Sequence, residues 1–284
     1  MKVKPLFIWA GGKTKMMKHY EDLFPSPFEH TIKSYSEPFF GGGAMFLNVA
    51  KRFPKLEKAY INDINSGLVS IYRNVKDNVD DFCDGMDKLQ AQYIPLSKEK
   101  RKEFFFDLRH KNAWEYQSWG NLKESYVLYF LMKTGFNGIW QINKNTNGRY
   151  GTPSGLLNQK ETVYDKWNVM AWNKLLNKFD VEILNVDWKD CPMGDFTFYD
   201  PPYRDSFANY NTSFPDSETE ELIKRVEENP KRFVWLSNRD SNDGFFDNRK
   251  ANIKKFPITY TAGRRKKTKE GFKATKATEI LLYN

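Results

Sequence analysis

Phe196-Thr197-Phe198-Tyr199-Asp200-Pro201-Pro202-Tyr203 is the stretch that decides the fold. Its apolar run 196–199 predicts a short, fully buried strand, and the two prolines behind it end that strand in a rigid turn. Short buried strands that alternate with helical segments are typical of an α/β sheet with helices on both faces. Ligands of such sheets bind beyond the carboxyl ends of the strands, so we expect Asp200 and Tyr203 at a binding edge.

The four residues Asp200 to Tyr203 have the chemistry of a receptor for an exocyclic amine on a planar base. The carboxylate of Asp200 and the carbonyl of Pro201 can both accept hydrogen bonds from one NH₂ group. Because proline has no N–H, no competing donor stands beside these acceptors. Tyr203 offers a flat face on which a ring can stack. The alternative is a plain turn with a solvent-exposed aspartate.

A second strand-to-helix turn lies upstream, in Glu37-Pro38-Phe39-Phe40-Gly41-Gly42-Gly43-Ala44. A strand over 35–39 meets three glycines, and a helix over 44–52 follows. Glycines let the backbone turn tightly and let a ligand lie against it. The stretch is neither GxGxxG nor a P-loop, so an ordinary turn is equally consistent with it. The next strand, 59–62, ends in Asn62-Asp63, where an acidic side chain can meet ribose hydroxyls.

The remaining segments complete the pattern. Trp9-Ala10-Gly11-Gly12-Lys13 precedes a helical stretch and is either a helix N-terminus or part of a small-molecule pocket. We predict further strands over 181–185 and 233–237, a helix over 218–228, and a closing antiparallel pair over 253–260 and 279–283. Residues 71–133 have helix-like patterns, with a helix over 125–133, and 137–155 reads as a hairpin or loop. The predicted domains are therefore 1–66 with 166–284, and an inserted 67–165.

Composition narrows the class of partner. Basic residues outnumber acidic ones by 45 to 36, a formal charge of +9, which favours a polyanion. The aromatic content of 16% suits stacking on bases as well as an ordinary core. The basic run 263–269 contains Arg264, Arg265, Lys266 and Lys267, and is either a solvated loop or a contact to that polyanion.

Other classes are not favoured. Two cysteines are too few for a disulfide framework and indicate a reducing, intracellular setting. Three scattered histidines have no metal-ligand spacing, so we expect no metal. No apolar run approaches the roughly 18 residues of a membrane span, and the N-terminal apolar run is too short for a signal peptide.

Taken together and in this order, the motifs resemble the Dam-like (group alpha) DNA adenine-N6 methyltransferases over nearly the whole chain. The resemblance implies a Rossmann-like, S-adenosylmethionine-dependent methyltransferase sheet with a helical target-recognition insert and a hairpin. It implies that Asp200, Pro201, Pro202 and Tyr203 are catalytic and hold a flipped adenine. It also implies a set of residues that bind S-adenosylmethionine: Trp9, Ala10, Gly12, Lys13, Glu37, Phe39, Phe40, Gly41, Gly43, Asp63, Asp187 and Asp200.

The same resemblance implies a DNA-reading hairpin over 136–151. Its DNA-binding residues would be Asn137, Trp140, Gln141, Asn143, Arg149 and Tyr150, and the family also favours DNA-backbone contacts for Arg264, Arg265, Lys266 and Lys267. Family members that read GATC carry an arginine near Gln141, and arginine suits guanine whereas glutamine suits adenine. The resemblance implies GATC or a related short site in double-stranded DNA, and Gln141 departs from the arginine of the GATC readers. A monomer in the cytoplasm of a bacterium or phage-infected cell is expected, with a separate restriction endonuclease as a further possible partner.

The implied chemistry is direct in-line attack of the adenine amine on a sulfonium methyl group, with no covalent enzyme intermediate. Two alternatives stay open at this point. An N4-cytosine DNA methyltransferase uses a similar amine receptor, but usually has serine where Asp200 stands. A non-catalytic DNA-binding module would share the basic charge without needing Asp200, Asp63 and the glycines. Methylation of an RNA or of a protein amide fits less well, because the amide enzymes typically have asparagine at the position of Asp200.

Overall fold

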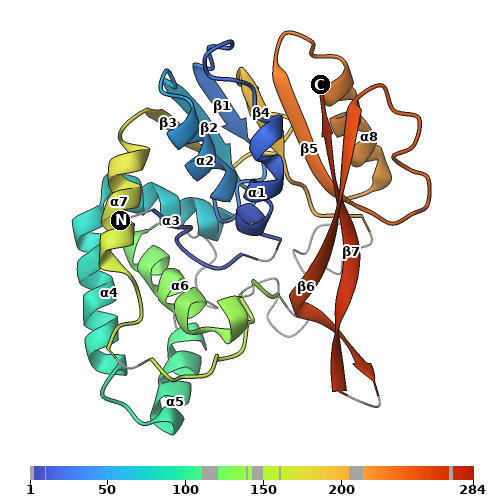
Figure 1. The fold of residues 1–284 in the computed structure, drawn as a ribbon. Helices are drawn as coiled ribbons and strands as arrows, with labels where there is room; N and C mark the ends of the chain where they lie inside the picture. The colour runs from blue at the N-terminus through green and yellow to red at the C-terminus, as the bar shows by residue number, and fades with distance from the viewer. Residues whose placement is uncertain are drawn as a thin grey trace.

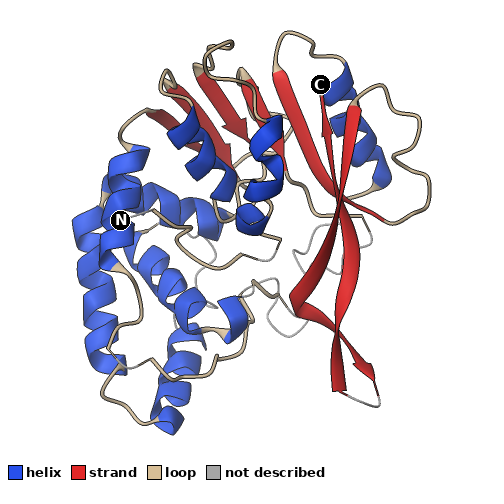
Figure 2. Ribbon diagram, in the orientation of Figure 1, coloured by secondary structure: helices blue, strands red, loops and turns tan. Residues whose placement is uncertain are grey.

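The computed structural model describes residues 3–9, 11–110, 121–138, 140–142, 150–159, 161–204, 214–268 and 271–284, without the side chains of 138 and 260–275. Over these residues the chain is an α/β protein, as the sequence predicted. A central sheet carries helices on both faces, and a group of helices stands to one side (Figures 1 and 2).

The described strands form one seven-stranded sheet in the order β3-β2-β1-β4-β5-β7-β6. Strands β1 to β5 pair in parallel, whereas β7 pairs antiparallel with both β5 and β6. Each predicted strand is present. Their bounds are β1 Ser34–Glu37, β2 Lys58–Asn62, β3 Asp180–Leu184, β4 Phe196–Tyr199, β5 Phe233–Asp240, β6 Asn252–Thr268 and β7 Gly271–Tyr283.

Helices cover the sheet and form the insert. The α-helices are α1 Met17–Tyr20, α2 Ala44–Arg52, α3 Ser66–Asp77, α4 Val79–Tyr93, α5 Lys98–Leu108, α6 Leu122–Thr134, α7 Lys166–Leu176 and α8 Asp216–Glu227. Short 3₁₀ turns span Lys13–Lys15, Glu21–Leu23 and Phe136–Gly138. In the part of the chain that is described, no helix combines the length and the apolar character that a membrane crossing requires.

Alternating side chains divide the core between the two faces of the sheet. Phe196 and Phe198 of β4 belong to the larger hydrophobic cluster, together with Phe46 of α2. Tyr199, next in sequence, points to the opposite face and joins Leu222 of α8 in a second cluster. Because consecutive strand residues face opposite sides, one fully buried strand supplies both cores, which explains why residues 196–199 are all aromatic apart from Thr197.

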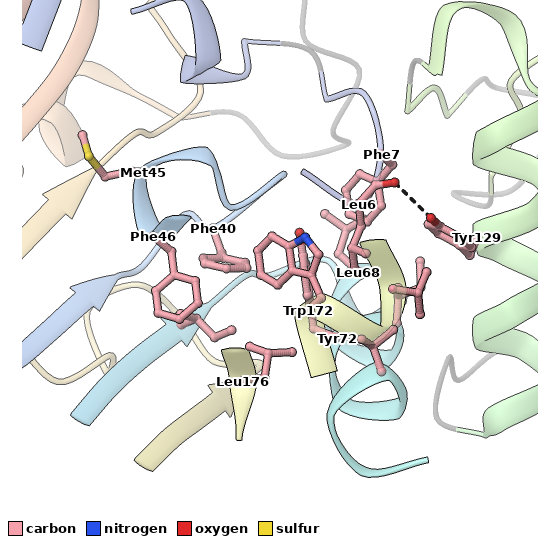
Figure 3. Packing of buried hydrophobic residues seen from close by; sticks show 14 of the residues in the cluster. Leu6, Phe7, Phe40, Met45, Phe46, Leu68, Tyr72, Tyr129, Trp172 and Leu176 are labelled. Atoms are coloured by element: carbon pink, nitrogen blue, oxygen red, sulfur yellow. Dashed lines mark hydrogen bonds between the residues drawn. The ribbon is translucent and has the colours of Figure 1, made fainter. Parts of the chain in front are cut away.

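The insert packs on the same core as the sheet. Figure 3 shows Phe40, Tyr72 and Trp172 in contact, with the Tyr129 hydroxyl donating a hydrogen bond to the Leu6 carbonyl at 3.1 Å. The larger cluster also includes residues of α4 and α6, so it continues from the sheet into the insert. The domain boundaries at 66/67 and 165/166 stay a prediction.

The closing pair is much longer than the sequence predicted. The basic run, expected between two strands, lies within β6 itself, where residues 265–268 pair with 271–274. A register shift between Tyr260 and Arg265 bends the pairing, after which the ribbon continues. Antiparallel pairing satisfies the backbone groups of a polar segment, so an apolar face is not required there. Figure 1 shows this ribbon projecting beyond the rest of the sheet.

The strand order fixes the position of the site. From β1 the chain crosses to β2 and β3 on one side, whereas β4 leads to β5 on the other. The loops that leave β1 and β4 therefore diverge, and ligands of open α/β sheets bind at such a switch point. Both singled-out turns, 37–44 and 200–203, follow these two strands.

Candidate active site

Asp200 and Lys13 form an ion pair at the carboxyl end of β4. The Lys13 ammonium lies 2.6 Å from Asp200 Oδ2 and also donates to the Gly11 carbonyl at 2.8 Å. The Lys13 side chain is only 3% exposed and that of Asp200 18%, so bulk water screens the pair poorly. The N-terminal segment and the turn after β4, 187 residues apart in the chain, meet here.

Burial dominates the acidity of Asp200. Desolvation raises its pKa from 3.8 to about 6, while the nearby Lys13 charge opposes that rise. Glu279 raises the pKa further, and Tyr203 lowers it through a hydrogen bond. The carboxylate is therefore available as an acceptor near neutral pH but is more easily protonated than a surface aspartate.

Tyr203 is fixed at the far end of its ring. A hydrogen bond of 3.1 Å joins its hydroxyl to Ser237 Oγ in β5, where Ser237 is fully buried. The Lys13 ammonium stands 4.8 Å from the ring centroid. Burial raises the pKa of Tyr203 well above its usual value, so the hydroxyl stays protonated. Asp200, Lys13 and Tyr203 thus form one contiguous cluster.

The glycine turn after β1 is shaped by Asp63. The carboxylate of Asp63 accepts from the Gly41 N–H and from the Asn65 N–H, both at 2.9 Å. Burial raises its pKa from 3.8 to about 6, and these two backbone donors oppose the rise. Asn62, fully buried, accepts from Val186 N–H and donates to the Pro38 carbonyl, which ties β2 to both neighbouring turns.

Two of the glycines are required by conformation and by space. Gly41 has φ +49°, and a Cβ there would lie 2.7 Å from the Trp9 ring. Gly43 has φ +69°, and its Cβ would meet the rings of Trp172 and Phe40 at 2.7 and 2.9 Å. A side chain at either position would strain the backbone and displace an aromatic ring. The turn therefore places bare backbone beside Trp9.

Two candidate residues lie below the turn. Glu37 is 3% exposed and accepts a hydrogen bond from the Tyr35 hydroxyl at 2.7 Å. Burial raises the pKa of Glu37 well above its usual range. The Phe40 ring packs in the core against Tyr72 and Trp172, a burial worth about 2 kcal/mol. In this structure both side chains support the turn from beneath.

Comparison with known proteins places these features in a family. Residues 9–268 match the family described as D12 class N6 adenine-specific DNA methyltransferase. The chain belongs to this family. The Type II methyltransferase M.MjaIII of Methanocaldococcus jannaschii is 32% identical over 86% of this chain and 87% of its own length.

Further relatives agree. The Type II methyltransferase M1.LlaDCHI of Lactococcus lactis subsp. cremoris is 27% identical over 99% of this chain and 95% of its own length. The DNA adenine methylase of Haemophilus influenzae is 24% identical over 85% of this chain and 81% of its own length. The protein is a DNA adenine-N6 methyltransferase, which confirms the predicted enzyme class over the cytosine-specific and non-catalytic alternatives. Its substrate is DNA, and its reaction needs a methyl donor.

The other candidate cofactor residues of the methyltransferase lie around the same edge. The Phe39 ring is half-buried on the second face, with its centroid 5.6 Å from Phe214 and 6.1 Å from Trp188. Asp187 is exposed in the turn after β3 and accepts from the Lys189 N–H at 2.9 Å. Gly12 donates its N–H to the Trp9 carbonyl at 3.0 Å. Ala10 lies outside the described residues.

The structure describes the predicted DNA-reading hairpin in part. Isolated bridges join Ile142 to Tyr150 and Gly135 to Ser154. Trp140 and Tyr150 are buried, and their ring centroids lie 5.3 Å apart. Asn137 is exposed and has φ 52°. The Gln141 N–H donates to Thr152 Oγ1 at 3.1 Å. Asn143 and Arg149 lie outside the described residues, as do the side chains of Arg264, Arg265, Lys266 and Lys267.

The sequence argument missed part of the active-site surroundings. Ser237, Asn238 and Arg204 contact the turn that carries Tyr203. A signal was present, because the apolar part of β5 gives way to the polar pair Ser237-Asn238 directly after Leu236, which pairs with the last residue of β4. Polar side chains buried at the carboxyl end of a central strand indicate a site in this class of fold.

Proposed function

We propose that this methyltransferase transfers the methyl group of S-adenosylmethionine to the N6 amine of a flipped adenine, within GATC or a related short duplex motif. Asp200, Pro201, Pro202 and Tyr203 hold the adenine in this proposal. The observation that carries it is the ion pair of Asp200 and Lys13, buried at the switch point beside the Tyr203 ring. A buried acceptor next to a flat aromatic face suits an exocyclic amine on a base.

The residues after β1 and β2 fit the proposed cofactor. A Cβ at Gly11 would meet no atom within 4 Å, so the backbone of the N-terminal segment has open space beside it. The half-buried Trp9 ring, which lies beside Gly41, offers a surface for stacking, and the carboxylate of Asp63 offers an acceptor for ribose hydroxyls. S-adenosylmethionine would be held by Trp9, Gly12, Lys13, Phe39, Gly41, Asp63 and Asp187. The residues that support this set would be Ala10, Glu37, Phe40 and Gly43. When bound, it supplies an electrophilic methyl group on a sulfonium leaving group.

The chain's own residues prepare the amine. The target nitrogen is inside the duplex, so the base must leave the stack at a cost of a few kcal/mol. Stacking on Tyr203 and hydrogen bonds to Asp200 and the Pro201 carbonyl offset that cost. By accepting the amine hydrogens, these oxygens draw the nitrogen out of conjugation with the ring and expose its lone pair. Catalysis is then mostly positioning and electrostatics.

Lys13 has a second task in this scheme. In the structure its ammonium occupies one oxygen of Asp200 at 2.6 Å. An adenine amine that uses Asp200 must share the carboxylate with Lys13 or displace it. Because Lys13 also bonds the Gly11 carbonyl, a small movement of its flexible stem leaves the ammonium with a partner.

Sequence reading is proposed for the hairpin and the ribbon. Gln141 suits an adenine edge, and Asn137, Asn143, Trp140 and Tyr150 complete or support the hairpin. Arg149 and the basic residues 264–267 contact phosphates, which position the protein without specifying bases. The net charge of +9 supports such contacts. The β6–β7 ribbon, which projects beyond the rest of the sheet (Figure 1), includes residues 264–267.

We further propose a cytoplasmic monomer. Relatives named Type II methyltransferases support a separate restriction endonuclease that reads the same motif.

The proposal is tested with plasmid DNA from a methylation-free host, incubated with purified enzyme and S-adenosylmethionine. Single-molecule sequencing should find N6-methyladenine at one short motif. Methylation at GATC would show that Gln141 coexists with that site, and another motif containing adenine would replace GATC in the proposal. Methyl transfer only to RNA, or methyladenine without any common motif, would contradict it.

A further inference from the structure

Arg204, the residue directly after Tyr203, is held by two acidic residues and a ring. Its Nε and Nη2 donate to the two carboxylate oxygens of Asp216 at 2.7 and 2.9 Å. Its Nη1 lies 2.9 Å from Asp243 Oδ2, in the loop after β5. The guanidinium stacks on Phe245, 3.7 Å from the ring centroid. A guanidinium group that is ion-paired along its edge and stacked on its face has little freedom to move.

The backbone of Arg204 is held as well. Its N–H donates to Asn238 Oδ1 at 3.4 Å, and its carbonyl accepts from Arg239 Nη2 at 3.2 Å. Asn238 is fully buried at the end of β5 and also receives the Arg239 N–H at 2.8 Å. The peptide units on both sides of Arg204 are therefore tied to β5.

These contacts explain how the Tyr203 ring is oriented. The hydroxyl end of the ring is fixed by Ser237, and its backbone end is fixed through Arg204. Two fixed ends set the direction of the ring's long axis, whereas one would leave the ring free to swing away from the base. Stacking on a base depends on where the ring lies.

We infer that Arg204 is a positioning residue that holds the Tyr203 ring in place for the extruded base. This inference rests on the proposed role of Tyr203 as the stacking partner. Direct binding of Arg204 to DNA phosphate is disfavoured by geometry, because its side chain is 9% exposed and already faces the carboxylates of Asp216 and Asp243. Arg204 acts through Tyr203, so its removal should impair extrusion of the base and turnover more than the affinity for DNA.

Arg249 provides a matched control. It makes a bidentate pair with Glu220 at 2.7 and 2.8 Å and lies 5.1 Å from the same Phe245 ring. It ties the same loop to α8 but is remote in sequence from Tyr203. A loss of loop stability alone would therefore affect Arg249→Ala and Arg204→Ala alike.

The experiment compares Arg204→Ala, Arg204→Lys, Arg249→Ala and Tyr203→Ala with the full-length wild-type enzyme. The duplex carries 2-aminopurine at the target adenine for the fluorescence assay of extrusion, and adenine for kcat and KM. DNA affinity is measured as a function of salt concentration.

Arg204→Ala should lower kcat by about 100-fold and reduce the 2-aminopurine signal, because a misplaced group costs about that much. Its DNA Kd should stay within about threefold and its salt dependence should be unchanged, because phosphate contacts set both. Arg204→Lys should be intermediate, since lysine keeps the charge without the fork. Arg249→Ala should keep kcat and the fluorescence signal.

Three outcomes would overturn the inference. If Arg204→Ala loses no more kcat than Arg249→Ala, Arg204 is merely structural. If the DNA affinity of Arg204→Ala falls and depends less on salt concentration, Arg204 contacts phosphate instead. If Tyr203→Ala extrudes the base and turns over normally, the proposed role of Tyr203 fails and the inference fails with it. Loss of function in Tyr203→Ala beside a normal Arg204→Ala overturns the inference alone.

Discussion

Asp63 and Asp200 stand at the same edge of the sheet and have the same raised pKa of about 6, yet their partners differ in kind. Asp63 accepts from two backbone N–H groups, those of Gly41 and Asn65. Asp200 is paired with a side-chain ammonium, that of Lys13. Burial is the largest cause of the raised pKa at both residues.

The difference in partners distinguishes a carboxylate that shapes the glycine turn, Asp63, from one that can bind the substrate amine, Asp200. Backbone donors cannot leave Asp63 unless the glycine turn rearranges, so each oxygen of that carboxylate keeps one turn contact and offers only its remaining lone pairs to the ribose. The ammonium of Lys13 ends a flexible stem, so the carboxylate of Asp200 can exchange it for another donor. Both acids are partly buried, but only Asp200 has a mobile side-chain partner that a substrate amine can replace. The predictions below test this contrast.

The largest effect is expected at Asp200. Asp200→Ala removes the amine acceptor and should reduce kcat by at least about 100-fold, the usual loss for one preorganised electrostatic partner. DNA affinity should be nearly unchanged, because phosphate contacts dominate it. Radiolabelled methyl transfer and a DNA-binding titration measure the two quantities. Asp200→Asn keeps the shape of the side chain and is the matched control. Full activity in either variant would remove Asp200 from the mechanism.

Lys13→Met should move the pH dependence of kcat. Burial raises the pKa of Asp200 and Lys13 opposes that rise, so without Lys13 the pKa increases further. The acid limb of the kcat profile should shift upward by roughly 1–3 pH units, since the carboxylate is the active form. Lys15, exposed in the same 3₁₀ turn, supplies the control Lys15→Met. An unshifted profile would mean that the pair does not govern Asp200.

Asp63→Asn should weaken cofactor binding and leave kcat nearly unchanged. The amide leaves one of two backbone donors without its acceptor, which costs about 1–3 kcal/mol and weakens binding of S-adenosylmethionine by roughly 10-fold. Calorimetry gives the affinity, and kcat is measured at saturating cofactor. A loss of kcat as large as that of the Asp200 variants would erase the distinction between the two acids.

The smallest effect is on stability. Because the pKa of Asp63 is raised in the folded state, its contribution is fully present below the unfolded pKa and is lost as pH rises through about 6. The free energy of unfolding should therefore fall by about 1 kcal/mol more in the wild type than in Asp63→Asn between about pH 4 and about pH 7. Urea unfolding at several pH values measures this, and parallel profiles would contradict it.

Local pattern was sufficient for most elements. The strand 196–199 was predicted at its observed bounds because a buried central strand is apolar on both faces. Helix 44–52 was also predicted at its bounds, since the glycines mark its start. The β6–β7 ribbon was underestimated, because basic residues 264–267 carry no strand signal, yet residues 265–268 pair with 271–274 across a short hairpin. The side chains of the candidate residues Glu37 and Phe40 are buried below the motif, and their role toward the cofactor stays a prediction.

By itself, the sequence determined the α/β class, the order of the motifs and the residue types able to accept an amine, because these depend on local periodicity and on chemistry. Only the tertiary structure decided which groups meet. It brought Lys13 to Asp200 across 187 residues, placed Ser237 and Asn238 beside Tyr203, and surrounded Arg204 with Asp216 and Asp243. Such contacts depend on strand order and loop direction, which are set by the packing of the whole sheet and have no signature in any single stretch of chain.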